Sequence, residues 1–157
     1  MSRPTSPALA GVSRAVTGCR FGMLSTFPPT ECGIATFAAA LSAGFIASGG
    51  SVDVVRVGGS PAIEDASVVA SLVGDATPDQ EAVAALNGTD IAVVQHEYGL
   101  YAGPDGAAVI DVIEALTVPT IMVAHTVLAQ PSPGQWAVLR RICDDVLDSV
   151  RSDRSPL

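Results

Sequence analysis

The sequence predicts an α/β protein with a doubly wound, Rossmann-like parallel sheet of about five strands and helices on both faces. Short apolar segments rich in Val alternate along the chain with segments whose apolar residues recur at helical spacing. Two of the strand segments, 91–95 and 120–125, contain an unbroken run of four apolar residues (91–94 and 121–124), which is typical of strands buried on both faces of a parallel sheet. Strands that alternate with helices pair in parallel through right-handed crossovers, and this gives the doubly wound arrangement.

Composition limits the class of protein and its partners. With 157 residues, of which 48% are apolar and 15% charged, the chain is sufficient for one globular domain. The formal charge of −8 disfavours nucleic acid and anionic membrane surfaces as partners. No run of about 18 apolar residues is present, so no transmembrane segment is expected. The cysteines (Cys19, Cys32 and Cys143) are odd in number and form no Cys-x-x-Cys pair, which disfavours a disulfide framework or a metal site and favours a cytoplasmic location.

The domain organisation follows from the distribution of polar and apolar residues. Residues 1–18 are rich in Ser, Pro, Ala and Gly without a sustained apolar run, and we expect a disordered tail. Residues 19–150 form the predicted domain, without an internal repeat or a second domain boundary. Residues 151–157 are too polar for a further core strand and are expected to be a polar tail.

The first half of the chain contains three expected strands and two expected helices. Strand 20–25 leads through a Pro-Pro loop to Gly33, where a helix begins whose apolar positions follow helical spacing up to Gly49-Gly50. Strand 52–57 follows, and segment 66–73 is a weaker strand that has a helical alternative. Pro78 then marks the first position of a helix that extends to about Leu86.

The second half repeats the pattern with stronger signals. The buried strand 91–95 precedes a helix with an apolar stripe at Val109, Val112, Ile113 and Leu116. Strand 120–125 comes next. Pro131-Ser-Pro then breaks the chain before a last helix, whose expected apolar face carries Trp136, Leu139, Cys143, Val146, Leu147 and Val150. Trp136 is therefore expected in the core.

Polar residues at the ends of two buried strands indicate a site. Strand 91–95 ends in Gln95, His96 and Glu97, and strand 120–125 ends in His125. In a Rossmann-type sheet the first and fourth strands are neighbours, and ligands bind outside the carboxyl ends of the strands. We therefore expect both histidines to open onto one crevice that faces the loop before Gly33. The alternative is that each histidine only satisfies backbone groups at a strand end.

The loop 28–33 offers backbone N–H groups at a helix start, where an anion is stabilised. It matches neither the dinucleotide fingerprint nor the P-loop, and an ordinary strand–helix connection is the alternative. Glu31 is placed to cap the helix or to contact a ligand, and Cys32 is expected to be a small buried residue. Tyr98 and Tyr101 are candidates to stack on a sugar or a base, although partly buried loop aromatics are commoner. Position 100 is Leu, so no His-Glu-x-x-His zinc motif is present.

Three segments together resemble a known family. Residues 24–37 (Leu-Ser-Thr-Phe-Pro-Pro-Thr-Glu-Cys-Gly-Ile-Ala-Thr-Phe), 94–103 (Val-Gln-His-Glu-Tyr-Gly-Leu-Tyr-Ala-Gly) and 123–128 (Val-Ala-His-Thr-Val-Leu) look like the amino-terminal domain of family 4 glycosyltransferases. The resemblance covers about residues 20–148. It implies the GT-B fold, in which two Rossmann-like domains enclose the active site.

The resemblance also implies roles for individual residues. On the donor side Gly33 would approach the phosphates of the nucleotide sugar, with Glu31, Cys32 and Thr126 nearby, and His125 would act on the donor sugar. The acceptor side would be lined by Gln95, His96, Glu97 and Tyr98. The implied reaction is retaining sugar transfer to a sugar or glycoside acceptor, without a metal or a cofactor.

The carboxyl-terminal domain that binds the nucleotide in this family has no counterpart in the sequence. The function predicted from the resemblance is therefore the acceptor-side half of a glycosyltransferase, incomplete alone, whose partner is a separate donor-binding domain. The alternative is a truncated, non-catalytic binding module or a remnant. An unrelated flavodoxin-like nucleotide-binding protein would need a phosphate loop, and the sequence contains none that we recognise.

Overall fold

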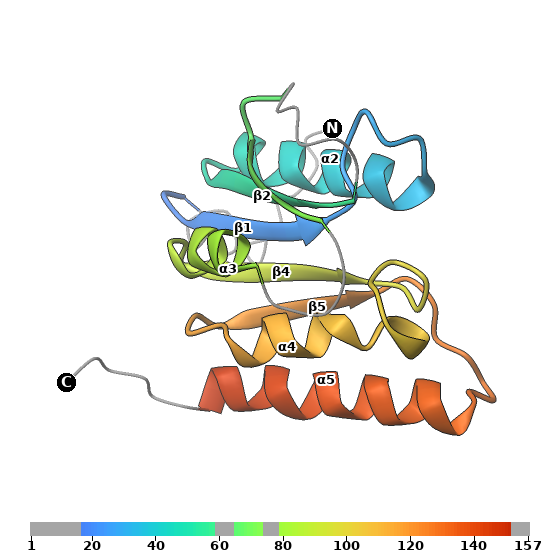
Figure 1. Cartoon of the computed structure of the whole chain (residues 1–157). Coiled ribbons are helices and arrows are strands. Elements are labelled where there is room, and N and C mark those ends of the chain that lie inside the picture. Colours follow the sequence, from blue (N-terminus) through green and yellow to red (C-terminus); the bar gives the residue numbers. More distant parts are fainter. Residues whose placement is uncertain (1–16, 59–64, 74–78, 152–157) are drawn as a thin grey trace, which may run out of the picture.

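The computed structural model describes residues 17–58, 65–73 and 79–151 (Figure 1). The strands are β1 (Arg20–Ser25), β2 (Ser51–Val57), β3 (Val68–Leu72), β4 (Ile91–His96) and β5 (Thr120–Ala124). The helices are α2 (Gly33–Ala47), α3 (Gln80–Asn87), α4 (Ala108–Glu114) and α5 (Pro133–Arg151), with a 3₁₀ turn η1 (Pro104–Gly106) before α4. Most of the two predicted tails, residues 1–16 and 152–157, lies outside the described residues.

The five strands form one parallel sheet in the order β3-β2-β1-β4-β5. This order confirms the predicted Rossmann-like fold and places β1 beside β4, where the direction of winding reverses. The segment with two possible assignments is a strand, β3. The helix expected to start at Pro78 is capped by Asp79, whose side chain accepts a hydrogen bond from Glu81 N, and Pro78 itself is outside the described residues.

The sheet separates two hydrophobic cores because successive strand residues point to opposite faces. On one face Met23, Val54 and Val93 pack with Ala38 of α2. On the other face Leu24, Val55 and Val94 belong to a larger core that includes residues of α3, α4 and α5. Because the side chains alternate, the face to which each polar residue at a strand end points follows from its position in the strand.

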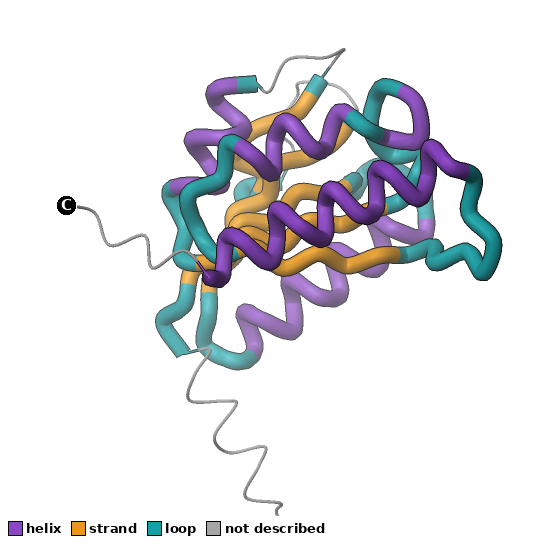
Figure 2. Tube along the Cα trace, turned by 90° about the horizontal axis from the view of Figure 1, so that it is seen from below, coloured by secondary structure: helices purple, strands orange, loops and turns teal. Residues whose placement is uncertain are grey.

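Helix α5 lies at the outside of the molecule, below α4 and β5 in Figure 1 and in front of the sheet in Figure 2. Its first turn is closed by a reciprocal pair, in which Ser132 N donates to Gln135 Oε1 at 2.9 Å and Gln135 N donates to Ser132 Oγ at 3.2 Å. Near its other end Ser149 Oγ accepts a hydrogen bond from Thr120 N of β5 at 3.1 Å. The helix therefore packs along the outer strand of the sheet.

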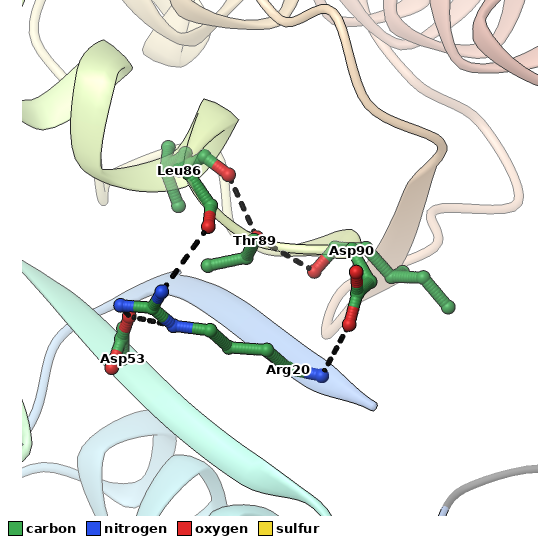
Figure 3. Close-up of polar contacts among 7 residues, drawn as sticks. Arg20, Asp53, Leu86, Thr89 and Asp90 are labelled. Atoms are coloured by element: carbon green, nitrogen blue, oxygen red, sulfur yellow. Dashed lines mark hydrogen bonds and ion pairs between the residues drawn. The ribbon is translucent and has the colours of Figure 1, made fainter. Parts of the chain in front are cut away.

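The amino-terminal edge of the sheet is joined by polar contacts around Arg20 (Figure 3). Arg20 Nε donates to Asp53 Oδ2 at 2.7 Å, and its backbone N donates to Asp90 Oδ2 at 2.7 Å. Beside them Thr89 Oγ1 donates to Leu86 O at 2.7 Å and closes the turn between α3 and β4. These contacts tie β1, β2 and the start of β4 together at this edge of the sheet.

We expect Gly22→Ala to lower the free energy of unfolding by about 1–3 kcal/mol, the usual cost of overpacking. A Cβ on Gly22 would lie 2.8 Å from Thr89 Oγ1 and 3.1 Å from Leu86 Cδ2. Thr89 cannot move away without loss of its hydrogen bond to Leu86. Urea unfolding measures the effect, with Gly33→Ala as the matched control because nothing lies within 4 Å of a Cβ there. Equal stabilities of the two variants would contradict the prediction.

Candidate functional site

A row of buried polar side chains crosses the carboxyl edge of the sheet on the face covered by α2. Ser25 ends β1, and it pairs in register with Arg56 of β2. Continuing the register from Leu24 and Val94 places Gln95 of β4 on the other side of Ser25. Ser25 and Gln95 are fully buried, and Arg56 is 2% exposed. All three alternate with residues of the larger core, so they face α2.

The row retains unused hydrogen-bonding groups. Ser25 Oγ and Gln95 Nε2 are buried and have no hydrogen-bond partner within the described part of the chain. Buried polar atoms in folded proteins are normally paired, because each unpaired one costs about 1–3 kcal/mol. Two such atoms on adjacent strands, at the point where the winding reverses, are suited to a polar ligand.

His125 completes this row from the next strand. Its Nε2 lies 2.7 Å from Gln95 Oε1, so the amide oxygen of Gln95 favours the tautomer that carries a proton on Nε2. The ring also makes an edge contact with Phe37 of α2, with 5.1 Å between ring centroids. Because His125 is only partly buried, its imidazole is accessible beside the start of α2. His125 therefore lies on the face of the sheet that α2 covers, and its expected position opposite the loop before Gly33 stays a prediction.

The start of α2 is exposed and open. Gly33 is the first residue of the helix, its φ is not positive, and no atom lies within 4 Å of the position that a Cβ would take. The fold therefore does not require glycine at this position. Glu31 is exposed in the loop before the helix, which contains the cis Pro28–Pro29 bond.

Cys32 is the N-cap of α2, and the prediction that it is buried is wrong. The residue is exposed, and its Sγ accepts a hydrogen bond from Ala35 N at 3.4 Å. Thr26 Oγ1 lies 3.3 Å from the same sulfur. The hydrogen bond with Thr26, supported by that from Ala35 N, lowers the pKa of the Cys32 thiol. The cap is thus a thiol, and Glu31 does not take this role.

His96 does not open onto the crevice, and the prediction that both histidines share it is wrong. His96 follows Gln95 directly, so its side chain points to the opposite face of the sheet from Gln95 and His125. It is fully buried, and neither ring nitrogen has a hydrogen-bond partner among the described residues. The ring of Tyr98 makes an edge contact with the ring of His96, with 5.3 Å between the ring centroids. A contribution of His96 to an acceptor site would require this region to rearrange.

We expect His96 to make the fold less stable in acid. Burial lowers the pKa of His96, and the charge of Glu97 opposes the shift only in part. Below about pH 6.5, the usual pKa of histidine, the unfolded chain therefore binds a proton that the folded chain resists. Stability should fall as the pH drops from 7 to 5, and His96→Leu should reduce this fall. Urea unfolding at several pH values tests it; parallel pH profiles for the two proteins would contradict it.

The remaining predicted residues lie in the loop after β4 and in the one after β5. Thr126 Oγ1 donates to Glu97 Oε2 at 2.5 Å, so the side chains of a predicted donor residue and a predicted acceptor residue bind each other. Tyr98 is partly buried, and its hydroxyl has no partner among the described residues. Tyr101 is buried and donates to Gln95 O at 2.7 Å. It therefore supports β4, and the stacking role considered for it is wrong.

The structure therefore divides the predicted site residues into three groups. Gln95, His125 and the start of α2 lie together, Glu97 and Thr126 join two loops, and His96 with Tyr98 lies apart. Sequence reasoning missed Ser25 and Arg56. The sequence signal for them is a polar residue at or near the end of a buried strand. The strand order is needed to show that Ser25 and Arg56 lie in one row with Gln95.

Within residues 17–58, 65–73 and 79–151, no three His, Cys, Asp or Glu side chains are grouped so that they could hold a metal ion. No helix in this part of the chain is long and apolar enough to span a bilayer.

The described residues define an α/β protein with a Rossmann-like sheet and a polar site where its winding reverses. Comparison of the chain with protein-family models, curated proteins and solved structures finds no match.

Proposed function

We propose that this chain is the acceptor-side half of a glycosyltransferase that moves a sugar from a nucleotide-sugar donor to a sugar or glycoside acceptor. The resemblance of three sequence segments to family 4 glycosyltransferases supports the proposal. The observation that carries it is the convergence of Ser25, Gln95 and His125 on the face of the sheet covered by α2, the helix whose open first residue is Gly33. These groups come from three separate strands and one helix, and the fold itself leaves part of their hydrogen-bonding capacity unused.

The geometry supports a division of labour within the site. Backbone N–H groups at the start of α2 carry partial positive charge and would stabilise the departing diphosphate. His125, oriented by Gln95, would bind a hydroxyl of the transferred sugar and hold it in the reactive position. The buried Arg56 adds a cationic group to the same row. No step requires a metal or another cofactor.

A second Rossmann-like unit is needed for turnover under this proposal. The described residues build one such unit, whereas the proposed reaction takes place between two. We expect the 157-residue chain alone to bind nucleotide sugars at millimolar concentrations, about −4 kcal/mol, and not to transfer sugar. Because the described residues build only one Rossmann-like unit, a second candidate function is a non-catalytic module that binds sugars.

The test is an NMR titration of the ¹⁵N-labelled full chain with nucleotide sugars, nucleoside diphosphates and simple glycosides. We expect fast-exchange shifts of the amides of Gly33, Ser25, Gln95 and His125, and no release of nucleoside diphosphate. Shifts confined to other parts of the chain, or none at about 10 mM of any ligand, would overturn the proposal. Steady turnover by the chain alone would overturn the requirement for a second unit. Shifts with glycosides but not with nucleotides would favour the binding module.

A further inference from the structure

Four of the six residues that the sequence pattern assigns to the core face of α5 are exposed, whereas Leu139 is partly buried and Val146 packs against the core. Trp136 is 57% exposed, Leu147 50% and Val150 66%, and Cys143 is exposed between them. The prediction that Trp136 lies in the core is therefore wrong. The core is contacted instead by Val138 and Ile142 from another side of the helix.

The exposed residues form a continuous stripe. Trp136, Cys143 and Val150 repeat at intervals of seven, and Leu147 lies one turn after Cys143. A seven-residue apolar repeat is the pattern with which one helix packs against another. Figure 1 and Figure 2 show α5 at the outside of the molecule, with no other described helix or strand on its outer side. We call the set Trp136, Cys143, Leu147 and Val150 the α5 stripe.

The charges beside the α5 stripe indicate which helix fits it. Arg140 lies in the first half of α5, and Asp144 and Asp148 lie in the second half. Arg140 and Asp144 are largely exposed and 3.9 Å apart, so they are not held tightly by each other. Two parallel copies of α5 would place like charges together. Two antiparallel copies centred on Cys143 place Arg140 of one beside Asp144 and Asp148 of the other.

The same antiparallel alignment matches the apolar residues. With Cys143 opposite its symmetry mate, Trp136 of one copy lies opposite Val150 of the other. The large ring and the smaller side chain then fill the space between the helices at both ends. A two-fold axis through Cys143 therefore satisfies both the apolar and the charged positions, as an isologous dimer requires.

We propose that the chain forms a two-fold symmetric homodimer through antiparallel packing of the α5 stripe on a second copy of itself. The partner is the same polypeptide, since its own charges complement those beside the stripe. The net charge of −8 opposes association at long range, so the dimer is expected at about 0.15 M salt or above, where the Debye length is about 8 Å.

Cross-linking tests the predicted axis in the full-length chain. In a Cys19→Ser/Cys32→Ser variant, mild oxidation should join two chains through Cys143. The matched control carries Cys143→Ser and Ala137→Cys, so that the thiol lies on the flank of the helix. This control should cross-link at least tenfold less. Equal cross-linking of both variants would overturn the proposed axis.

Solution measurements test the interface itself. Sedimentation equilibrium should give a mass that rises toward twice the monomer, and the emission of Trp136, the single tryptophan, should shift to shorter wavelength as concentration rises. Arg140→Asp should weaken the dimer at least tenfold, and the added change Asp148→Arg should restore it. A monomer at every concentration up to about 0.5 mM, or a failure of this reversal, would overturn the proposal.

Discussion

We expect Gly33→Val to abolish the proposed sugar transfer in a complex completed by a donor-binding domain, while the midpoint of thermal unfolding stays unchanged. A phosphate can approach the backbone at the start of α2 only if no side chain projects there. The space in front of Gly33 is empty of protein atoms, so the valine side chain fits the fold and occupies the place of the ligand. We expect kcat/KM to fall at least 100-fold, which corresponds to about 2.7 kcal/mol.

The matched control is Gly44→Val in the same helix. Gly44 also has no atom within 4 Å of the position that a Cβ would take, but it lies near the other end of α2. Transfer by this variant should equal that of the wild type. The two variants can also be compared without the donor-binding domain, by NMR titration with a nucleoside diphosphate. Gly33→Val should lose the amide shifts that the ligand causes, and Gly44→Val should keep them. Unchanged transfer and unchanged shifts in Gly33→Val would remove this glycine from the proposed site.

We expect His125→Ala to lower kcat of the proposed transfer by about 100-fold in the completed complex, with a smaller change in KM. The expected loss is that of one preorganised hydrogen bond that is stronger in the transition state than in the ground state. Gln95→Leu should cost about tenfold in kcat, because the 2.7 Å contact that orients the imidazole is lost although the imidazole remains.

A double-mutant cycle separates orientation from direct contact. If Gln95 acts through His125, the double variant His125→Ala/Gln95→Leu should be no slower than His125→Ala alone. Additive losses would show that Gln95 contacts the substrate itself. Full activity of His125→Ala would remove this residue from the proposed mechanism.

The fold could be predicted from the sequence because its signals are local. The unbroken apolar runs at 91–94 and 121–124 predict strands, and their alternation with helical stripes leaves few topologies. The run at 91–94 lies in the central strand β4, whereas β5 is an edge strand and the prediction that it is buried on both faces is wrong, because Ile121 is 47% exposed. The stripe at Val109, Val112, Ile113 and Leu116 is buried as the spacing indicates. The order of the strands then follows from the general rules for doubly wound sheets.

The positions of single side chains were predictable only in part. His96 and Gln95 adjoin in the sequence, but a strand sends them to opposite faces, so only one can meet His125. On α5 the helical spacing is compatible with two apolar faces, and helical periodicity alone does not show which one meets the sheet. The spacing therefore predicts Trp136 in the core, whereas the core contains Val138 and Ile142 and Trp136 is exposed.

By itself the sequence determined the class of fold, the succession of its elements and the loop and strand ends at which a site forms, because each depends on residues near one another in the chain. Only the tertiary structure decided which of those residues meet. The parallel register brings Ser25 between Arg56 and Gln95, and the packing of α2 brings Phe37 against His125. Contacts of this kind depend on strand order and facing, which join residues that are distant in the sequence.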